Sequence, residues 1–200
     1  MSVLIVLLLA VLSRVLPVAF HQQSWNFSLL GGSLLFIGSR MTSGSPRLHP
    51  SEQARRGPRF SAAWKIAGVL AVLMVTDYAI TVYGYNFPFH VSGYLLTWAW
   101  YVGICVLGMG LFRKITVLRV AAGAIAAPTS FFLLSNLAVW MGGMYTHTLS
   151  GLAQCYTMAL PFYRNDLAST TLTVAALFGL PALAHRIIES VESANNNLAA

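Results

Sequence analysis

Charged residues are scarce in this sequence, and acidic residues are the scarcest of them. Only 8% of the 200 residues are charged, with 12 Lys and Arg against 5 Asp and Glu, whereas 57% are hydrophobic. A chain of this length cannot bury so much apolar surface in one water-soluble core, so lipid must be the solvent for most of it. The composition therefore predicts a polytopic membrane protein.

Cysteine is also nearly absent, and no motif of a catalytic or metal site is found. Cys105 and Cys155 have neither the spacing of metal ligands nor the density of a disulfide framework. His21, His90 and His147 lack the i, i+4 spacing and the accompanying carboxylates of a metal site. There is no glycine-rich phosphate loop, no Gly-x-Ser-x-Gly elbow and no catalytic carboxylate pair. We therefore expect no enzyme activity, no cofactor and no bound metal.

Six apolar segments are candidates for membrane-spanning helices. A spanning helix needs about 20 mostly apolar residues, and five segments meet this length. The remaining one, residues 27–39, is short and glycine-rich, so it is either a thin span packed against other helices or a re-entrant segment; we predict a span. The five longer segments are residues 2–20, 62–83, 91–112, 115–141 and 167–185. The fold class expected is an all-α bundle of six transmembrane helices, forming one domain over residues 1–187.

Positive charge is concentrated on one side of this predicted bundle. Because cytoplasmic loops collect Lys and Arg, we expect both termini in the cytoplasm of a multi-pass protein of the bacterial inner membrane. Residues 41–60 then form a flexible cytoplasmic linker, and residues 188–200 form a disordered tail. We attribute the net charge of +7 to topology and expect no nucleic-acid partner. The basic residues on that side are Arg40, Arg47, Arg55, Arg56, Arg59, Lys65, Arg113, Lys114, Arg119 and Arg186.

Arg14 and Asp77 are the two clear cases of an ionisable side chain well inside a predicted span. Such residues are rare in a bilayer because each is costly, so each is a candidate functional residue. Both lie within about one or two helical turns of the outer end of their segments, at a similar depth. The sequence therefore predicts an ion pair between them. The pair is either a structural clasp or a clasp that also contacts a solute.

The segment 115–141 carries a polar face near its outer end. Thr129, Leu133, Asn136 and Trp140 follow a 4, 3, 4 spacing, which places them on one side of a helix. An Asn in lipid must form hydrogen bonds, so Asn136 either joins helices or anchors a ligand. Trp140 also suits the headgroup level of the membrane. Asn136 is the residue on which we place the predicted binding site.

Polar residues follow this segment before the chain turns apolar again. Apolar positions recur there at steps of three or four, which is typical of an amphipathic helix. They are Leu149, Leu152, Tyr156, Leu160 and Tyr163. We expect residues 145–163 to form a helix that lies on the outer surface and caps a cavity in the bundle, close to Asn136, Trp140 and Arg164. Asn165 or Asp166 is then predicted to N-cap the last span. Asp166 either has this capping role or contacts a ligand, and we predict the cap.

Several short segments carry a family resemblance. They are "LSRVLP", the following "NF", "TDYAI", "LSNLAVWMGGMYTHTLSGLAQCYTMALPFYRND" and "TLTVAALFG". They resemble a family of uncharacterised bacterial membrane transport proteins, which is similar in size and layout to the substrate-binding S components of energy-coupling-factor uptake systems. The resemblance implies a six-helix, S-component-like fold whose small-molecule pocket opens outward. It implies that the following residues line or support the pocket: Arg14, Asn26, Asp77, Asn136, Trp140, Tyr145, Arg164 and Asn165.

Two classes of function stay open. The first is a solute-binding and transport subunit that captures a small nutrient from the outer face of the lipid bilayer. Since the chain has no ATP-binding motif of its own, a transmembrane coupling subunit and ATPases would then be its partners. The alternative is a structural or assembly subunit of a larger membrane complex, with no solute of its own. A membrane-embedded enzyme is a third, less supported class.

Overall fold

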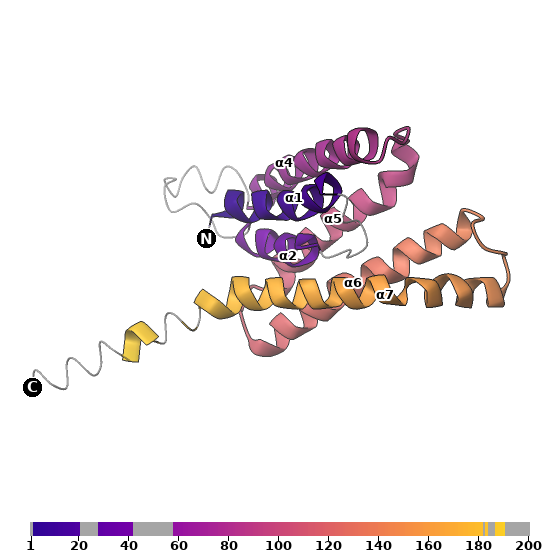
Figure 1. The fold of residues 1–200 in the computed structure, drawn as a ribbon. Helices are drawn as coiled ribbons and strands as arrows, with labels where there is room; N and C mark the ends of the chain where they lie inside the picture. The colour runs from indigo at the N-terminus through magenta and orange to yellow at the C-terminus, as the bar shows by residue number, and fades with distance from the viewer. Residues whose placement is uncertain (1, 21–27, 42–57, 182, 184–186, 191–200) are drawn as a thin grey trace, which may run out of the picture.

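Every regular element among the described residues is a helix, as the composition predicted. The computed structural model describes residues 2–20, 28–41, 58–181, 183 and 187–190 (Figure 1). The elements are α1 (Val3–Ala19), α2 (Leu30–Met41), α4 (Pro58–Ala79), the π-helical turn η2 (Ile80–Gly84), α5 (Val91–Leu111), α6 (Val117–Met141), α7 (Leu149–Val174) and the π-helical turn η3 (Ala175–Gly179). Most of the predicted linker, most of the predicted tail and Asn26 lie outside the described residues.

Three helices are long and apolar enough to cross a membrane. They are Ala62–Gly84, Val91–Leu111 and Val117–Met141. These ranges agree with three of the predicted spans. Helix α1 is also apolar, but at 17 residues it is shorter. Length and composition therefore indicate a membrane protein.

The helices run alternately in opposite directions (Figure 1). The start of α1, the start of α4, the α5–α6 connection and the end of α7 lie at one end of the molecule. We call this the basic end. The connection from η2 to α5 and the turn from α6 to α7 lie at the other end, which we call the hairpin end. The described basic residues at the ends of α2, α4, α5 and α6 all belong to the basic end: Arg40, Lys65, Arg113, Lys114 and Arg119.

The short helix α2 is the core of the bundle. It contacts α1, α4, α5, α6 and α7, and most of its residues are buried. Glycines allow it to approach α5 closely. A Cβ atom on Gly38 would lie 2.1 Å from the carbonyl oxygen of Cys105, and one on Gly108 would lie 2.3 Å from that of Leu35. The glycines of segment 27–39 therefore mark a helix that packs tightly against other helices.

The prediction of a separate capping helix is wrong. Helix α7 begins at Leu149 and continues without a break to Val174, so the predicted cap and the first part of the predicted last span form one helix. It packs lengthwise on α6 (Figure 1). The Tyr156 hydroxyl donates to the carbonyl oxygen of Leu133 at 2.7 Å, and the Tyr163 hydroxyl lies 2.9 Å from Thr129 Oγ1. Two residues of the amphipathic stripe, Tyr156 and Tyr163, thus face α6, whereas Leu149 and Leu160 are exposed.

Candidate functional site

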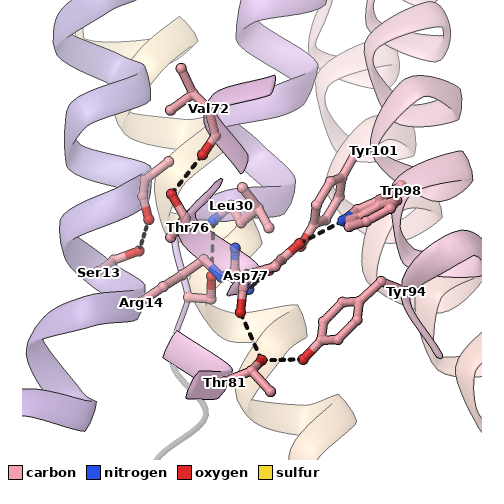
Figure 2. Close-up of polar contacts among 12 residues, drawn as sticks. Ser13, Arg14, Leu30, Val72, Thr76, Asp77, Thr81, Tyr94, Trp98 and Tyr101 are labelled. Atoms are coloured by element: carbon pink, nitrogen blue, oxygen red, sulfur yellow. Dashed lines mark hydrogen bonds and ion pairs between the residues drawn. The ribbon is translucent and has the colours of Figure 1, made fainter. Parts of the chain in front are cut away.

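Arg14 on α1 and Asp77 on α4 form the predicted ion pair (Figure 2). Arg14 Nη2 donates to Asp77 Oδ1. Two residues of α5 add further donors: Trp98 Nε1 donates to Oδ2 at 2.9 Å, and the Tyr101 hydroxyl donates to Oδ1 at 3.4 Å. Asp77 is only 1% exposed. A carboxylate with three donors, one of them charged, is well satisfied in a buried site. Asp77 therefore joins α1, α4 and α5.

Sequence and local structure together explain how α5 presents these donors. Trp98 and Tyr101 are three residues apart, so both side chains point to the same side of the helix. The indole of Trp98 is held by a row of rings: Phe89 stacks on Tyr94 with centroids 4.9 Å apart, and Tyr94 on Trp98 at 5.9 Å. Trp98 and Tyr101 were not among the predicted site residues. The three-residue spacing of Trp98 and Tyr101 was visible in the sequence, but their shared partner on α4, Asp77, was not.

The other nitrogen of the guanidinium group is unpartnered. Arg14 Nη1 is buried and has no hydrogen-bond partner among the described residues. An arginine carries five N–H donors, so one carboxylate cannot satisfy them all. A buried donor without a partner costs about 1 to 3 kcal/mol. This nitrogen is therefore a strong hydrogen-bond donor for an acceptor that the described chain does not supply.

Arg14 lines two cavities that meet at the ion pair. The first, which we call the outer cavity, has a volume of about 220 Å³ and lies among α1, the end of α4 and η2. The second, which we call the central cavity, has a volume of about 280 Å³ and is bordered by α1, α2, α4, α5, α6 and α7. Both are lined by Ser28, Asp77 and Tyr94 as well. The Arg14 side chain thus lies beside both cavities.

Aromatic side chains form an apolar wall of the central cavity. Trp100 on α5 and Phe131 on α6 both line it, and their ring centroids are 4.8 Å apart. Trp100 Nε1 donates to Ser130 Oγ at 3.0 Å, which holds the indole in place. Thr97 adds a hydroxyl group to the lining. The cavity therefore combines a cation, a small number of polar groups and flat apolar surfaces, as small-molecule sites do.

Asp166, for which the sequence favoured a helix cap over a ligand contact, lines a cavity. It was predicted to N-cap the last span, but α7 begins at Leu149, and its cap is Thr148, whose Oγ1 accepts from the Gly151 amide at 3.1 Å. Asp166 instead lies inside α7 and lines the central cavity. Its side chain is partly buried and accepts one hydrogen bond, from Thr170 Oγ1 at 3.5 Å. The helical spacing that continues from Leu149 past Tyr163 was the signal that could have placed it there.

Asn136 lies between α6 and α7. It lines a third cavity, of about 180 Å³, which we call the hairpin cavity and which Asp166 and Tyr163 also line. Asn136 Nδ2 donates to the carbonyl oxygen of Phe132 at 2.8 Å. The Cys155 thiol of α7 lies 3.4 Å from the carbonyl oxygen of Asn136. The side chain thus faces a cavity, as predicted, but that cavity is inside the α6–α7 pair.

Comparison with known proteins places the chain in a family. Residues 57–191, more than half of the chain, match a family model described as a family of unknown function (DUF6580). The chain belongs to this family. No curated protein and no solved structure matches it. The match agrees with the uncharacterised family expected from the sequence, and it provides no link to S components.

In this member of DUF6580, two further predicted site residues lie at the end of α6 and in the turn that follows it. Trp140 Nε1 donates to the carbonyl oxygen of Thr146 at 2.9 Å, and its ring lies edge-on to His147 at 5.3 Å. Tyr145 is partly buried in the same turn. Arg164 is exposed on α7. Neither Trp140 nor Arg164 lines the hairpin cavity, so the predicted grouping of both residues around Asn136 is not what the structure shows.

Asn165 and the possible metal ligands remain to be placed. Asn165 lies inside α7, partly buried, and not at a helix start. It is not a lining residue of the outer, central or hairpin cavity. Within the described part of the chain, no group of three or more His, Cys, Asp or Glu side chains is placed to hold a metal ion. The site that the structure assembles is therefore centred on Arg14, Asp77 and Asp166.

Proposed function

We propose that the protein is an integral membrane solute-binding and transport subunit, which captures a small nutrient from the outer face in the central cavity. One observation carries this proposal: Arg14 Nη1 is buried, unpartnered among the described residues, and its side chain lines a cavity. A solute with an oxygen acceptor would supply the missing hydrogen bond. The gain would offset a cost of about 1 to 3 kcal/mol that the empty site carries.

The size and lining of the central cavity limit the solute. Its volume of about 280 Å³ lies just below the range of roughly 300 to 1,000 Å³ that is typical of sites for drug-sized ligands. Trp100 and Phe131 offer flat apolar surface, and Thr97 and Arg14 offer hydrogen bonds. A compact molecule with one polar end and a short apolar body matches this lining. Larger cofactors do not fit without a change in shape.

The proposed topology is an S-component-like bundle of six spans in the bacterial inner membrane, with both termini in the cytoplasm. The alternating directions of α1, α2, α4, α5, α6 and α7 support it (Figure 1). The basic residues at one end of the molecule support the orientation. A coupling subunit and ATPases would supply the energy for uptake, since the sequence has no ATP-binding motif.

The assembly-subunit hypothesis is the second candidate, and one observation favours it. The hydrogen-bond donors to Asp77 come from two other helices of the same chain, α1 and α5, so the polar group can be explained by helix packing. Asn136 also bonds within its own helix and contacts α7. If Arg14 Nη1 only meets water in the cavity, the whole polar cluster is structural.

Native mass spectrometry of the gently extracted protein tests the two candidates. We expect a retained small molecule on the wild-type chain. Arg14→Lys keeps a cation for Asp77 but removes the second nitrogen, so it should lower solute occupancy by about tenfold or more, the loss of one charge-assisted hydrogen bond. Arg119→Lys, the same exchange at the basic end, is the matched control and should retain the solute. No retained molecule, or equal retention by both variants, would favour the assembly subunit.

A further inference from the structure

We infer that Asp166 binds an ammonium group, so that the solute class of the central cavity is a small organic amine with an oxygen acceptor at its other end. This inference rests on the proposed function. It goes further because it assigns a charge to the solute and a ligand contact to Asp166. Asp166 differs from Asp77 in its partners, and it lines the cavity together with an unbalanced set of charges and an aromatic wall.

Asp166 has few partners for an ionisable residue in the middle of a helix bundle. Oδ1 accepts one long hydrogen bond, from Thr170 at 3.5 Å, and within the described chain Oδ2 accepts none. Asp77, which lines the same cavity, receives three donors. An ionised carboxylate in a low-dielectric site needs a counter-charge or several donors. The described protein supplies these for Asp77 and does not supply them for Asp166.

The charges that line the central cavity do not balance. Arg14 contributes one positive charge, and Asp77 and Asp166 contribute one negative charge each. Arg14 and Asp77 neutralise each other in their ion pair. Asp166 forms no ion pair with a described residue, so one negative charge faces the cavity uncompensated. A solute with a single positive charge would restore neutrality.

The lining favours an organic ammonium group over a metal ion. Trp100 and Phe131 line the cavity with Asp166, and aromatic rings attract organic cations through their faces. A hard metal ion would need about six oxygen ligands, and among the described residues no group of three or more His, Cys, Asp or Glu side chains is placed to hold one. Arg14 Nη1, from the α1 side of the cavity, requires an acceptor. A molecule with an ammonium group and an oxygen acceptor would supply the partner that each of the two residues lacks.

Three probes of matched size test the inference on the full-length protein in detergent at pH 7. Ethanolamine carries both groups, propylamine replaces the hydroxyl with a methyl group, and propanol replaces the ammonium with a methyl group. We expect ethanolamine and propylamine to raise the unfolding temperature of the wild-type protein more than propanol at the same concentration, with ethanolamine raising it most. Asp166→Asn should weaken ethanolamine binding by about tenfold or more, because it removes one charge-assisted contact. Glu189→Gln, which removes an exposed acidic charge outside the cavity, should not.

The outcomes separate this inference from the proposed function. The amine assignment would be overturned if the three probes raised the unfolding temperature equally. It would also be overturned if ethanolamine raised the unfolding temperature of Asp166→Asn as much as that of the wild-type protein. A rise in the unfolding temperature with sodium chloride alone, absent from Asp166→Asn, would also overturn the amine assignment. The site would then bind an inorganic cation. If the wild-type protein retains a solute that Arg14→Lys loses, and that solute has no amine nitrogen, the inference fails and the proposed function stands. No retained solute and no probe shift would overturn both.

Discussion

The two carboxylates inside this bundle, Asp77 and Asp166, line the same cavity and have opposite surroundings. Asp77 is 1% exposed and is held by a cation, an indole and a phenol from two other helices. Asp166 is partly buried and accepts one long hydrogen bond from its own helix. Both are part of the segment matched by the family model, whereas Arg14 lies outside it.

The difference separates a structural group from a group available to a ligand. Every oxygen of Asp77 is engaged by protein donors, so its charge contributes to the attachment of α1 and α5 to α4. Asp166 has an oxygen without a donor in the described chain, and it faces open space. Substitutions at the two positions should therefore differ in their effect on folding, and the following predictions are ordered by the size of that effect.

The largest effect is expected for Asp77→Ala. It leaves the Arg14 cation buried without a partner, so the free energy of unfolding should fall by about 3 to 5 kcal/mol. The double variant Asp77→Ala with Arg14→Leu removes both charges and should recover much of this loss. Denaturant titration in detergent measures both. Strictly additive losses would show that the two residues do not interact and would remove the basis of the comparison.

A smaller loss is expected for Trp98→Phe. It removes the donor to Asp77 Oδ2 at 2.9 Å, and an unsatisfied buried acceptor costs about 1 to 3 kcal/mol. Tyr101→Phe is the milder companion because its hydroxyl lies 3.4 Å from Oδ1, which already has Arg14. We expect it to cost less than Trp98→Phe in the same titration. A larger loss for Tyr101→Phe would mean that the phenol is the main neutral donor.

Asp166→Asn should change stability little. It removes a charge that has one weak partner, so we expect the free energy of unfolding to stay within about 1 kcal/mol of the wild-type value or to rise. Asp77→Asn is the matched control, because it makes the same exchange at the carboxylate whose oxygens both accept hydrogen bonds from the protein. It should be clearly destabilising. Equal losses for the two variants would contradict the division into a structural and an available carboxylate.

The smallest effect is expected for Thr170→Val. The two side chains have the same shape, and the hydrogen bond that is lost spans 3.5 Å, so the cost should be about 0.5 kcal/mol or less. Thr170 is fully buried, which makes the substitution a sensitive test of that bond. Thermal unfolding of the variant beside the wild type measures it. A loss above that of Trp98→Phe would show that Thr170 holds Asp166 firmly.

Part of this site could be predicted and part could not, and the reasons are physical. Arg14 and Asp77 were paired from the sequence because two opposite charges at a similar depth in lipid have few other partners. Trp98 and Tyr101 were not, because many side chains of α5 could reach α4 equally well on sequence grounds. Asp166 was misplaced because its neighbourhood has both the polar residues of a helix start and the spacing of a continuing helix.

The sequence by itself determined the all-helical class, the three long apolar helices and the charge asymmetry, because these depend on composition and local spacing. Tertiary structure decided what each amphipathic face meets. The stripe through Tyr156 and Tyr163 suits a membrane surface and a neighbouring helix equally well, and only the position of α6 selects the second. In the same way, the burial of α2 and the exposure of Asp166 to a cavity follow from contacts between segments far apart in the chain. Such contacts depend on the relative placement of whole helices, which no local pattern contains.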